Sequence, residues 1–146
     1  MKKILFIFFF LIIDFIFSQL FLLNFLEKNM VNANRESFEN RIFNKDYKYT
    51  FKKSANFNSQ YYGNIYKVST NDLGFRDETS RPLNRNEKFS IVIGDSFVEG
   101  VGLEYDDTLV GKLNKNSSNL KDKIKFLNAG VSSYSSYIYL KKIKTI

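Results

Sequence analysis

Residues 89–102 read FSIVIGDSFVEGVG, and this stretch decides the fold that the sequence predicts. The β-branched run at 91–93 is typical of a strand that is buried on both faces, and Gly94 marks the point where the strand ends. Ligands of open α/β sheets bind outside the carboxyl ends of the strands, so Ser96 is well placed for nucleophilic chemistry. The simpler alternative is a strand followed by a polar turn.

The pattern of an apolar run followed by glycine returns at residues 124–130, which read IKFLNAG. Between the two runs, apolar residues recur at helical spacing over 109–113, and Asp106 or Asp107 can cap that helix. A strand, a helix and a strand at these distances predict a right-handed βαβ unit with parallel strands. The predicted fold class is therefore α/β, with the two strands beginning a doubly wound sheet.

Two short blocks meet if both strands end at the same edge of the sheet: residues 94–96 (Gly-Asp-Ser) and residues 128–130 (Asn-Ala-Gly). Acyl transfer needs a nucleophile and hydrogen-bond donors aimed at the developing oxyanion. A glycine offers an N–H group that no side chain obstructs. The arrangement predicts Ser96 N–H and Gly130 N–H as the pair of donors.

Upstream, residues 47–52 and 65–70 read as two short strands. Tyr47, Tyr49 and Phe51 would line one face of the first strand, with lysines on the other. Lysines interleaved with aromatic residues also resemble a stacking groove for single-stranded nucleic acid. The half-buried strand explains the pattern more simply, because the net charge of +7 is spread over the whole chain. No nucleic-acid partner is predicted.

Residues 71–77 read NDLGFRD and predict a compact turn ahead of the opening strand. Gly74 allows a positive φ angle, and the Asn and Asp side chains can bond the local backbone. From spacing alone, a surface salt bridge from Arg76 to Asp77 or Glu78 is favoured. The alternative is that Arg76 reaches an anionic group.

Residues 4–26 are mostly apolar and follow two lysines. This length predicts one transmembrane helix that serves as a signal anchor, since about 20 residues span a bilayer; a cleaved signal peptide is the weaker alternative. Asp14 lies within the run and receives no functional role. The charge distribution predicts a single-pass membrane protein with its carboxyl-terminal domain outside the cytoplasm. Residues 27–87 then form a juxtamembrane linker with short strands, and residues 88–146 an incomplete α/β domain.

Cysteine and histidine are both absent from the 146 residues. Without cysteine the chain has no disulfide framework and no thiolate metal site. Without histidine it cannot supply an imidazole, the commonest general base.

The two blocks resemble those of the SGNH, or GDSL-type, hydrolases, specifically the membrane-anchored bacterial members. Residues 94–97 (GDSF) match the first block, with phenylalanine in place of the common leucine, and residues 128–132 (NAGVS) resemble the second. The resemblance implies a flavodoxin-like parallel sheet with flanking helices, Ser96 as the nucleophile and Gly130 as an oxyanion-hole donor. It also implies a serine esterase or O-acyltransferase that needs no cofactor and acts on ester bonds, such as those of an O-acylated glycan.

The later blocks of that family have no counterpart in the chain. The third block would contribute an oxyanion-hole asparagine, and the fifth would contribute the Asp and His of the catalytic triad. A serine that lacks its base is a weak nucleophile, so we expect an amino-terminal portion of such an enzyme, inactive as it stands. The alternative is a non-catalytic, membrane-anchored binding or assembly module on the same scaffold.

Overall fold

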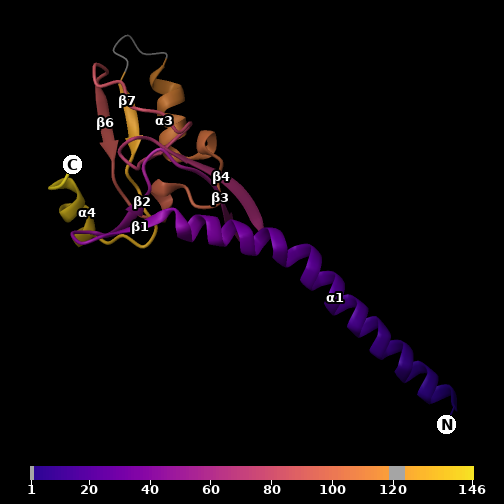
Figure 1. The fold of residues 1–146 in the computed structure, drawn as a ribbon. Helices are drawn as coiled ribbons and strands as arrows, with labels where there is room; N and C mark the ends of the chain where they lie inside the picture. Colours follow the sequence, from indigo (N-terminus) through magenta and orange to yellow (C-terminus); the bar gives the residue numbers. More distant parts are fainter. Residues whose placement is uncertain (1, 119–123) are drawn as a thin grey trace. The chain divides into compact units, whose positions relative to one another are not determined.

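A computed structural model describes residues 2–118 and 124–146 of the chain (Figure 1). The chain divides into two compact units, Met1–Asn32 and Ala33–Ile146. The second unit contains the strands and all of the residues that the sequence marks as candidates for function.

Helix α1 (Lys2–Glu39) covers the amino-terminal part of the chain. Its described side chains at 6–20 are solvent-exposed, and Asp14 and the polar pair at 18–19 interrupt their apolar run. Within the described ranges, no helix is both long enough and apolar enough to cross a membrane. This finding contradicts the transmembrane helix predicted over residues 4–26.

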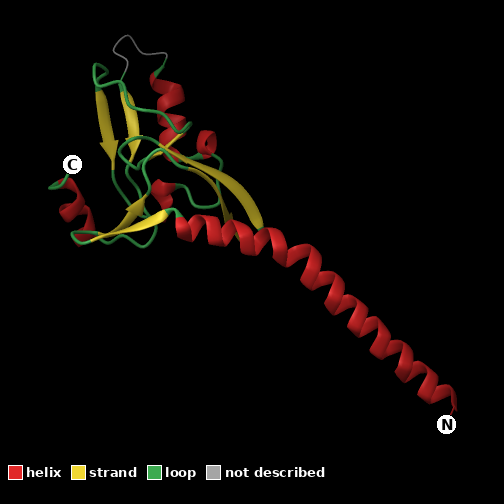
Figure 2. Cartoon of the chain, viewed as in Figure 1, coloured by secondary structure: helices red, strands yellow, loops and turns green. Residues whose placement is uncertain are grey.

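A five-stranded mixed sheet forms the centre of the second unit, with the strand order β3-β4-β5-β7-β6. Figure 2 draws the strands in yellow. Its strands are β3 (Asn56–Tyr61), β4 (Asn64–Thr70), β5 (Arg76–Asp77), β6 (Phe89–Val92) and β7 (Lys125–Asn128). The predicted parallel pair is present as β6 and β7, in the register Ile91↔Leu127. The other described pairs of this sheet are antiparallel.

The mixed sheet contradicts the flavodoxin-like parallel sheet that the sequence led us to expect. The cause is β5, a strand of two residues that pairs antiparallel with β4 on one side and with β7 on the other. It joins the β3–β4 hairpin to the parallel pair, so the upstream strands belong to the same sheet. Two residues carry no readable period, and the sequence therefore predicted a turn at this point.

Strands β1 (Arg41–Asn44) and β2 (Lys48–Phe51) form a separate antiparallel sheet. The strands predicted over 47–52 and 65–70 are thus confirmed as β2 and β4. Phe51 is buried in the larger hydrophobic core, and Tyr47 and Tyr49 pack against it, which confirms the predicted inward face. Thr50, on the face predicted to be solvated, is buried as well, so the prediction for that face is wrong at this residue. The buried members of this core are Phe51, Phe57, Tyr66, Val68, Val131, Tyr134 and Ile138.

The helices of the second unit are short and follow the strand ends. They are α2 (Ser96–Glu99), the 3-10 turn η1 (Tyr105–Asp107), α3 (Leu109–Ser117) and α4 (Ser136–Ile143). The helix predicted over 109–113 is confirmed as α3, but the predicted cap at Asp106 or Asp107 is wrong. Those residues form η1, and the Thr108 hydroxyl caps α3 by accepting a hydrogen bond from Gly111 N–H at 3.0 Å.

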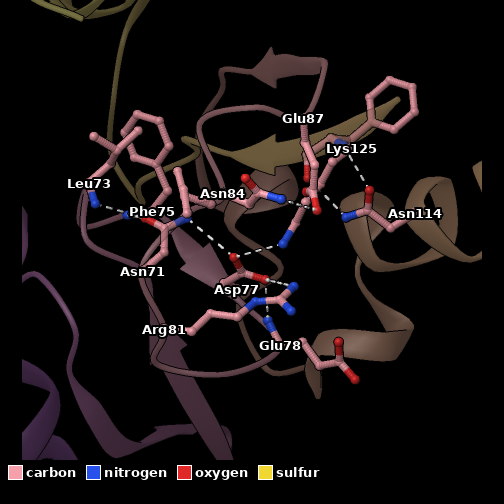
Figure 3. Close-up of polar contacts among 12 residues, drawn as sticks. Asn71, Leu73, Phe75, Asp77, Glu78, Arg81, Asn84, Glu87, Asn114 and Lys125 are labelled. Carbon is pink, nitrogen blue, oxygen red and sulfur yellow. Dashed lines mark hydrogen bonds and ion pairs between the residues drawn. The ribbon is translucent and has the colours of Figure 1, made fainter. Parts of the chain in front are cut away.

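The turn between β4 and β5 has the local bonding that the sequence predicts. The Asn71 side-chain oxygen accepts hydrogen bonds from Leu73 N–H at 3.0 Å and from Phe75 N–H at 3.1 Å (Figure 3). Gly74 has a φ angle of +77°, and a Cβ there would lie 2.6 Å from the Phe51 carbonyl oxygen. The hydrogen bonds to Asn71 and the close approach of Gly74 to Phe51 fix the path of the chain into β5, which begins at Arg76.

The Arg76 side chain is 1% exposed and donates to four backbone carbonyls. Nη1 bonds the carbonyls of Glu99 and Gly100 at 2.9 and 2.7 Å, and Nη2 bonds those of Lys67 and Leu103 at 3.2 and 2.5 Å. The predicted surface salt bridge to Asp77 or Glu78 is therefore wrong. Because a buried charged group needs hydrogen-bond partners inside the protein, the guanidinium donates to these carbonyls. Arg76 thereby links the β3–β4 hairpin to the end of α2 and the segment that follows it.

We expect Arg76→Met to lower the free energy of unfolding by about 3 kcal/mol or more, because four buried carbonyls lose a charged donor. Urea denaturation followed by circular dichroism measures the loss. Arg85→Met is the matched control: its ion pair with Asp72 is exposed, so its loss should stay below about 1 kcal/mol. Equal losses in the two variants would contradict a structural role for Arg76.

Candidate active site

The two sequence blocks lie side by side beyond the carboxyl ends of β6 and β7. Ala129 N–H donates to the Val92 carbonyl at 2.9 Å, and Val131 N–H donates to the Gly94 carbonyl at 3.0 Å. These bonds continue the parallel ladder past the ends of the strands. The convergence that the sequence predicts is confirmed by this pairing.

Helix α2 packs directly on the glycines of both blocks. A Cβ on Gly94 would lie 2.4 Å from Val98 Cγ2, and a Cβ on Gly130 would lie 2.4 Å from Glu99 N and 2.7 Å from the Val98 carbonyl carbon. All three distances are shorter than real Cβ atoms show. The glycines are therefore needed for the close approach of α2, in addition to any chemistry of their N–H groups.

Ser96 is the first residue of α2 and is partly exposed. Asp95 caps the helix, and its Oδ1 accepts a hydrogen bond from Phe97 N–H at 3.0 Å. The Ser96 carbonyl accepts from Gly100 N–H and Val101 N–H at 2.9 and 3.1 Å. Within the described ranges, neither the hydroxyl nor the N–H of Ser96 has a hydrogen-bond partner. The backbone of this serine is fixed while its reactive group is left available.

Gly130 N–H is already occupied. It donates to Asn128 Oδ1 at 3.0 Å, and the Asn128 side-chain amide donates to the Val98 carbonyl at 2.7 Å. Asn128 is fully buried, so this bridge fastens α2 to the end of β7. In this arrangement Ser96 N–H is available as an oxyanion donor, whereas Gly130 N–H is not.

Glu99 is a buried residue of the site that the sequence analysis missed. Its carboxylate accepts from Arg41 Nη2 at 2.7 Å and from Ser132 N–H. The Arg41 guanidinium also lies 4.5 Å from the ring centre of Phe51. The glutamate therefore joins α2 to β1 and to the loop of the second block. In the sequence, Glu99 is connected with the site only by its position three residues after Ser96, on the same short helix.

Lys142 on α4 is a second buried charged residue that the sequence analysis missed. Its ammonium donates to the Ala129 carbonyl at 2.9 Å and lies 5.1 Å from the ring centres of both Phe75 and Tyr134. Burial lowers the pKa of Lys142 to about 8, against the opposing attraction of Glu99. The sequence pattern does not reveal that Lys142 is buried, because this residue follows another lysine in an otherwise amphipathic helix.

Among the described residues, no group of three or more carboxylates is arranged to hold a metal ion. Neither a family model nor a curated protein sequence matches the chain. The resemblance to the SGNH hydrolases therefore depends on residues 94–97 and 128–132 themselves.

Gly130→Ala should lower the free energy of unfolding by about 2–3 kcal/mol, because the added methyl group overlaps α2. Gly63→Ala is the control: a Cβ there meets nothing within 4 Å, so it carries only the cost of its positive φ, about 1 kcal/mol. Urea denaturation of both variants measures the difference. A Gly130→Ala protein as stable as Gly63→Ala would show that α2 does not rest on Gly130.

Lys142 should make stability depend on pH. Its pKa is lower in the folded protein than the usual value of 10.5, so the unfolded chain holds this proton to higher pH. The free energy of unfolding therefore gains a contribution as the pH rises from about 8 towards 10.5. We expect wild type to gain stability relative to Lys142→Met over this window, measured by urea denaturation at several pH values.

The exposed neighbour Lys141 supplies the control for the pH experiment, because Lys141→Met should give a curve parallel to that of wild type. A parallel curve for Lys142→Met as well would contradict the burial of its ammonium group.

Proposed function

We propose that Ser96 is the nucleophile of a serine esterase or O-acyltransferase site that acts on an ester bond, such as that of an O-acylated glycan. The observation that carries the proposal is the partly exposed Ser96 hydroxyl, which has no hydrogen-bond partner among the described residues and stands on a backbone that is fixed beyond the carboxyl end of β6. Ligands bind at such strand ends in open α/β sheets. The resemblance of residues 94–97 to a nucleophile block supports the same assignment.

In this proposal, the Ser96 oxygen attacks the ester carbonyl and Ser96 N–H donates to the oxyanion that develops. When the oxyanion collapses, the bond to the ester alcohol breaks and the alcohol leaves with a proton. The acyl group stays on Ser96 until water, or an acceptor hydroxyl in the case of transfer, takes it. The attack also requires a base that removes the hydroxyl proton, and the sequence contains no histidine. Lys142 does not fill this role in the structure, because its described hydrogen bond goes to the Ala129 carbonyl. We therefore assign the nucleophile and its support to this chain, and we supply the base from solution in the test below.

The second candidate function is a non-catalytic binding or assembly module on the same scaffold. One observation favours it: four consecutive amides of the second block are engaged within the protein. Ala129, Gly130, Val131 and Ser132 donate to Val92, Asn128, Gly94 and Glu99 respectively. Because these four amides already donate to acceptors inside the protein, they are not available to an oxyanion. In this second candidate, the block serves to hold α2 in place.

Imidazole added to the solution can replace a missing base, and this tests the proposal. With p-nitrophenyl acetate as the substrate, we expect imidazole to accelerate hydrolysis about tenfold or more over the Ser96→Ala protein measured in the same buffer. Peptide mass spectrometry should locate the acetyl group on Ser96. Ser135→Ala is the control, because Ser135 is an exposed serine whose side chain makes no capping bond.

Two results would reject the nucleophile and favour the binding module. One is hydrolysis that is equally fast in wild type and Ser96→Ala at every imidazole concentration. The other is acetylation that is spread over exposed serines without enrichment at Ser96.

A further inference from the structure

A series of hydrogen bonds begins at the buried ammonium of Lys142 and runs through the second block. Lys142 is 1% exposed, and its Nζ donates to the Ala129 carbonyl at 2.9 Å. That carbonyl belongs to the same peptide group as Gly130 N–H, which donates to Asn128 Oδ1 at 3.0 Å. The ammonium is therefore bonded to the oxygen of one amide, and the nitrogen of that amide is bonded to Asn128.

The series continues from the second block into α2 and ends at the candidate nucleophile. The Asn128 side-chain amide donates to the Val98 carbonyl at 2.7 Å. Glu99 N–H belongs to the same peptide group as that carbonyl, and it donates to the Asp95 carbonyl at 2.9 Å. The Asp95 carbonyl and Ser96 N–H again form one peptide group. Among the described residues Ser96 N–H has no acceptor, so the series ends on an available donor.

Four amide groups are thus connected head to tail, and we call them the amide network. Each accepts a hydrogen bond at its oxygen and carries its donor at its nitrogen. Hydrogen bonds in such a series polarise one another, because a bond accepted at the oxygen of an amide makes its N–H group a stronger donor. The four groups are the Ala129–Gly130 peptide, the Asn128 side chain, the Val98–Glu99 peptide and the Asp95–Ser96 peptide.

The ammonium at the start of the amide network acts on one described acceptor. Within the part of the chain that the structure describes, Lys142 Nζ donates to the Ala129 carbonyl and forms no ion pair. A charge in a site of low dielectric acts more strongly on its acceptor than it would in water. Three aromatic rings provide this environment, with centres 5.1, 5.1 and 5.7 Å from Nζ: those of Phe75, Tyr134 and Tyr47.

We propose that Lys142 is a positioning residue of the candidate active site, and that its charge strengthens Ser96 N–H as an oxyanion donor through the amide network. This inference rests on the proposed function, in which Ser96 N–H meets the oxyanion. It differs from a purely structural role of Lys142, because it depends on the charge of the ammonium rather than on its packing. A neutral amine at the same place still bonds Ala129 but adds no charge to the network.

The pH decides how much of this charge is present. Burial lowers the pKa of Lys142 to about 8, against the attraction of Glu99, which faces it from α2 and pairs with Arg41 at 2.7 Å. The other titratable groups that face the ammonium are Tyr47 and Tyr134. Burial raises the pKa of both phenols above 10.0, so they stay neutral while Lys142 titrates. The polarisation of Ser96 N–H is therefore complete well below pH 8 and is lost as the pH rises through this value.

Hydrolysis of p-nitrophenyl acetate by the full chain in imidazole buffer measures the effect, once the rate of Ser96→Ala in the same buffer is subtracted. At about pH 7 we expect Lys142→Met to lower the remaining rate about threefold. The advantage of wild type over this variant should shrink as the pH rises through about 8. A role in stability alone predicts the opposite trend, because wild type gains stability over this window. Lys141→Met is the control and should match wild type at every pH.

Carbon-detected NMR of the wild-type chain follows the amide network without catalysis or substitution. The ¹⁵N resonances of Gly130, Glu99 and Ser96 should titrate with a common midpoint near pH 8, with a shift that decreases in this order. Phe97 is the internal control, because its N–H bonds the Asp95 side chain outside the network. Its resonance should move less than that of Ser96.

The proposal is overturned if the Gly130 resonance titrates and that of Ser96 moves no more than that of Phe97. It is also overturned if the advantage of wild type over Lys142→Met stays level or grows as the pH rises. A Ser96→Ala protein as active as wild type would instead reject the nucleophile of the proposed function, and the NMR titration would still decide whether Lys142 polarises Ser96 N–H.

Discussion

A buried guanidinium group is costly unless its N–H donors find acceptors inside the protein, and Nη1 and Nη2 of Arg76 donate to four backbone carbonyls. Two of these carbonyls belong to Glu99 and Gly100, at the end of α2, and the others belong to β4 and to the loop after α2. The space for the guanidinium depends on a missing side chain, because a Cβ on Gly100 would lie 3.3 Å from Arg76 Nη1. One side chain on a two-residue strand therefore links the β3–β4 hairpin to the end of α2 and to the loop that follows it.

The position of Ser96 is a consequence of this constraint and of three others that act on α2 from different sides. Gly94 and Gly130 let the helix approach the strand ends, Asn128 bonds the Val98 carbonyl, and Glu99 reaches across to β1. None of these contacts uses the Ser96 hydroxyl. Support that surrounds a reactive group without touching it is what a fixed nucleophile requires. Asn128 and Glu99 also accept hydrogen bonds from the amides of Gly130 and Ser132 in the second block, which is why a binding module remains the second candidate.

The parts of the fold that could be predicted are those encoded in local patterns. The β-branched run at 91–93 predicts β6, and the apolar run that ends before Gly130 predicts β7. Alternation predicts the inward face of β2, and Asn71 with Gly74 predicts the turn before β5. The parts that could not be predicted depend on contacts between distant residues. Strand β5 is too short to show a period, and Arg76 and Lys142 look like surface residues because nothing nearby in the sequence shows what buries them. The apolar content of residues 4–26 predicts a membrane span, and the helices of the described ranges do not bear this out.

The central claim is that the fold presents Ser96, among the serines of the second unit, as the reactive one. The most direct measurement is covalent labelling with a fluorophosphonate in the presence of imidazole, with the labelled residue identified by peptide mass spectrometry. Displacement of fluoride by the serine oxygen leaves a stable adduct at the nucleophile. The account predicts label on Ser96 and little on the exposed serines Ser133, Ser135 and Ser136. Label distributed evenly over these four serines, or confined to the other three, would contradict it.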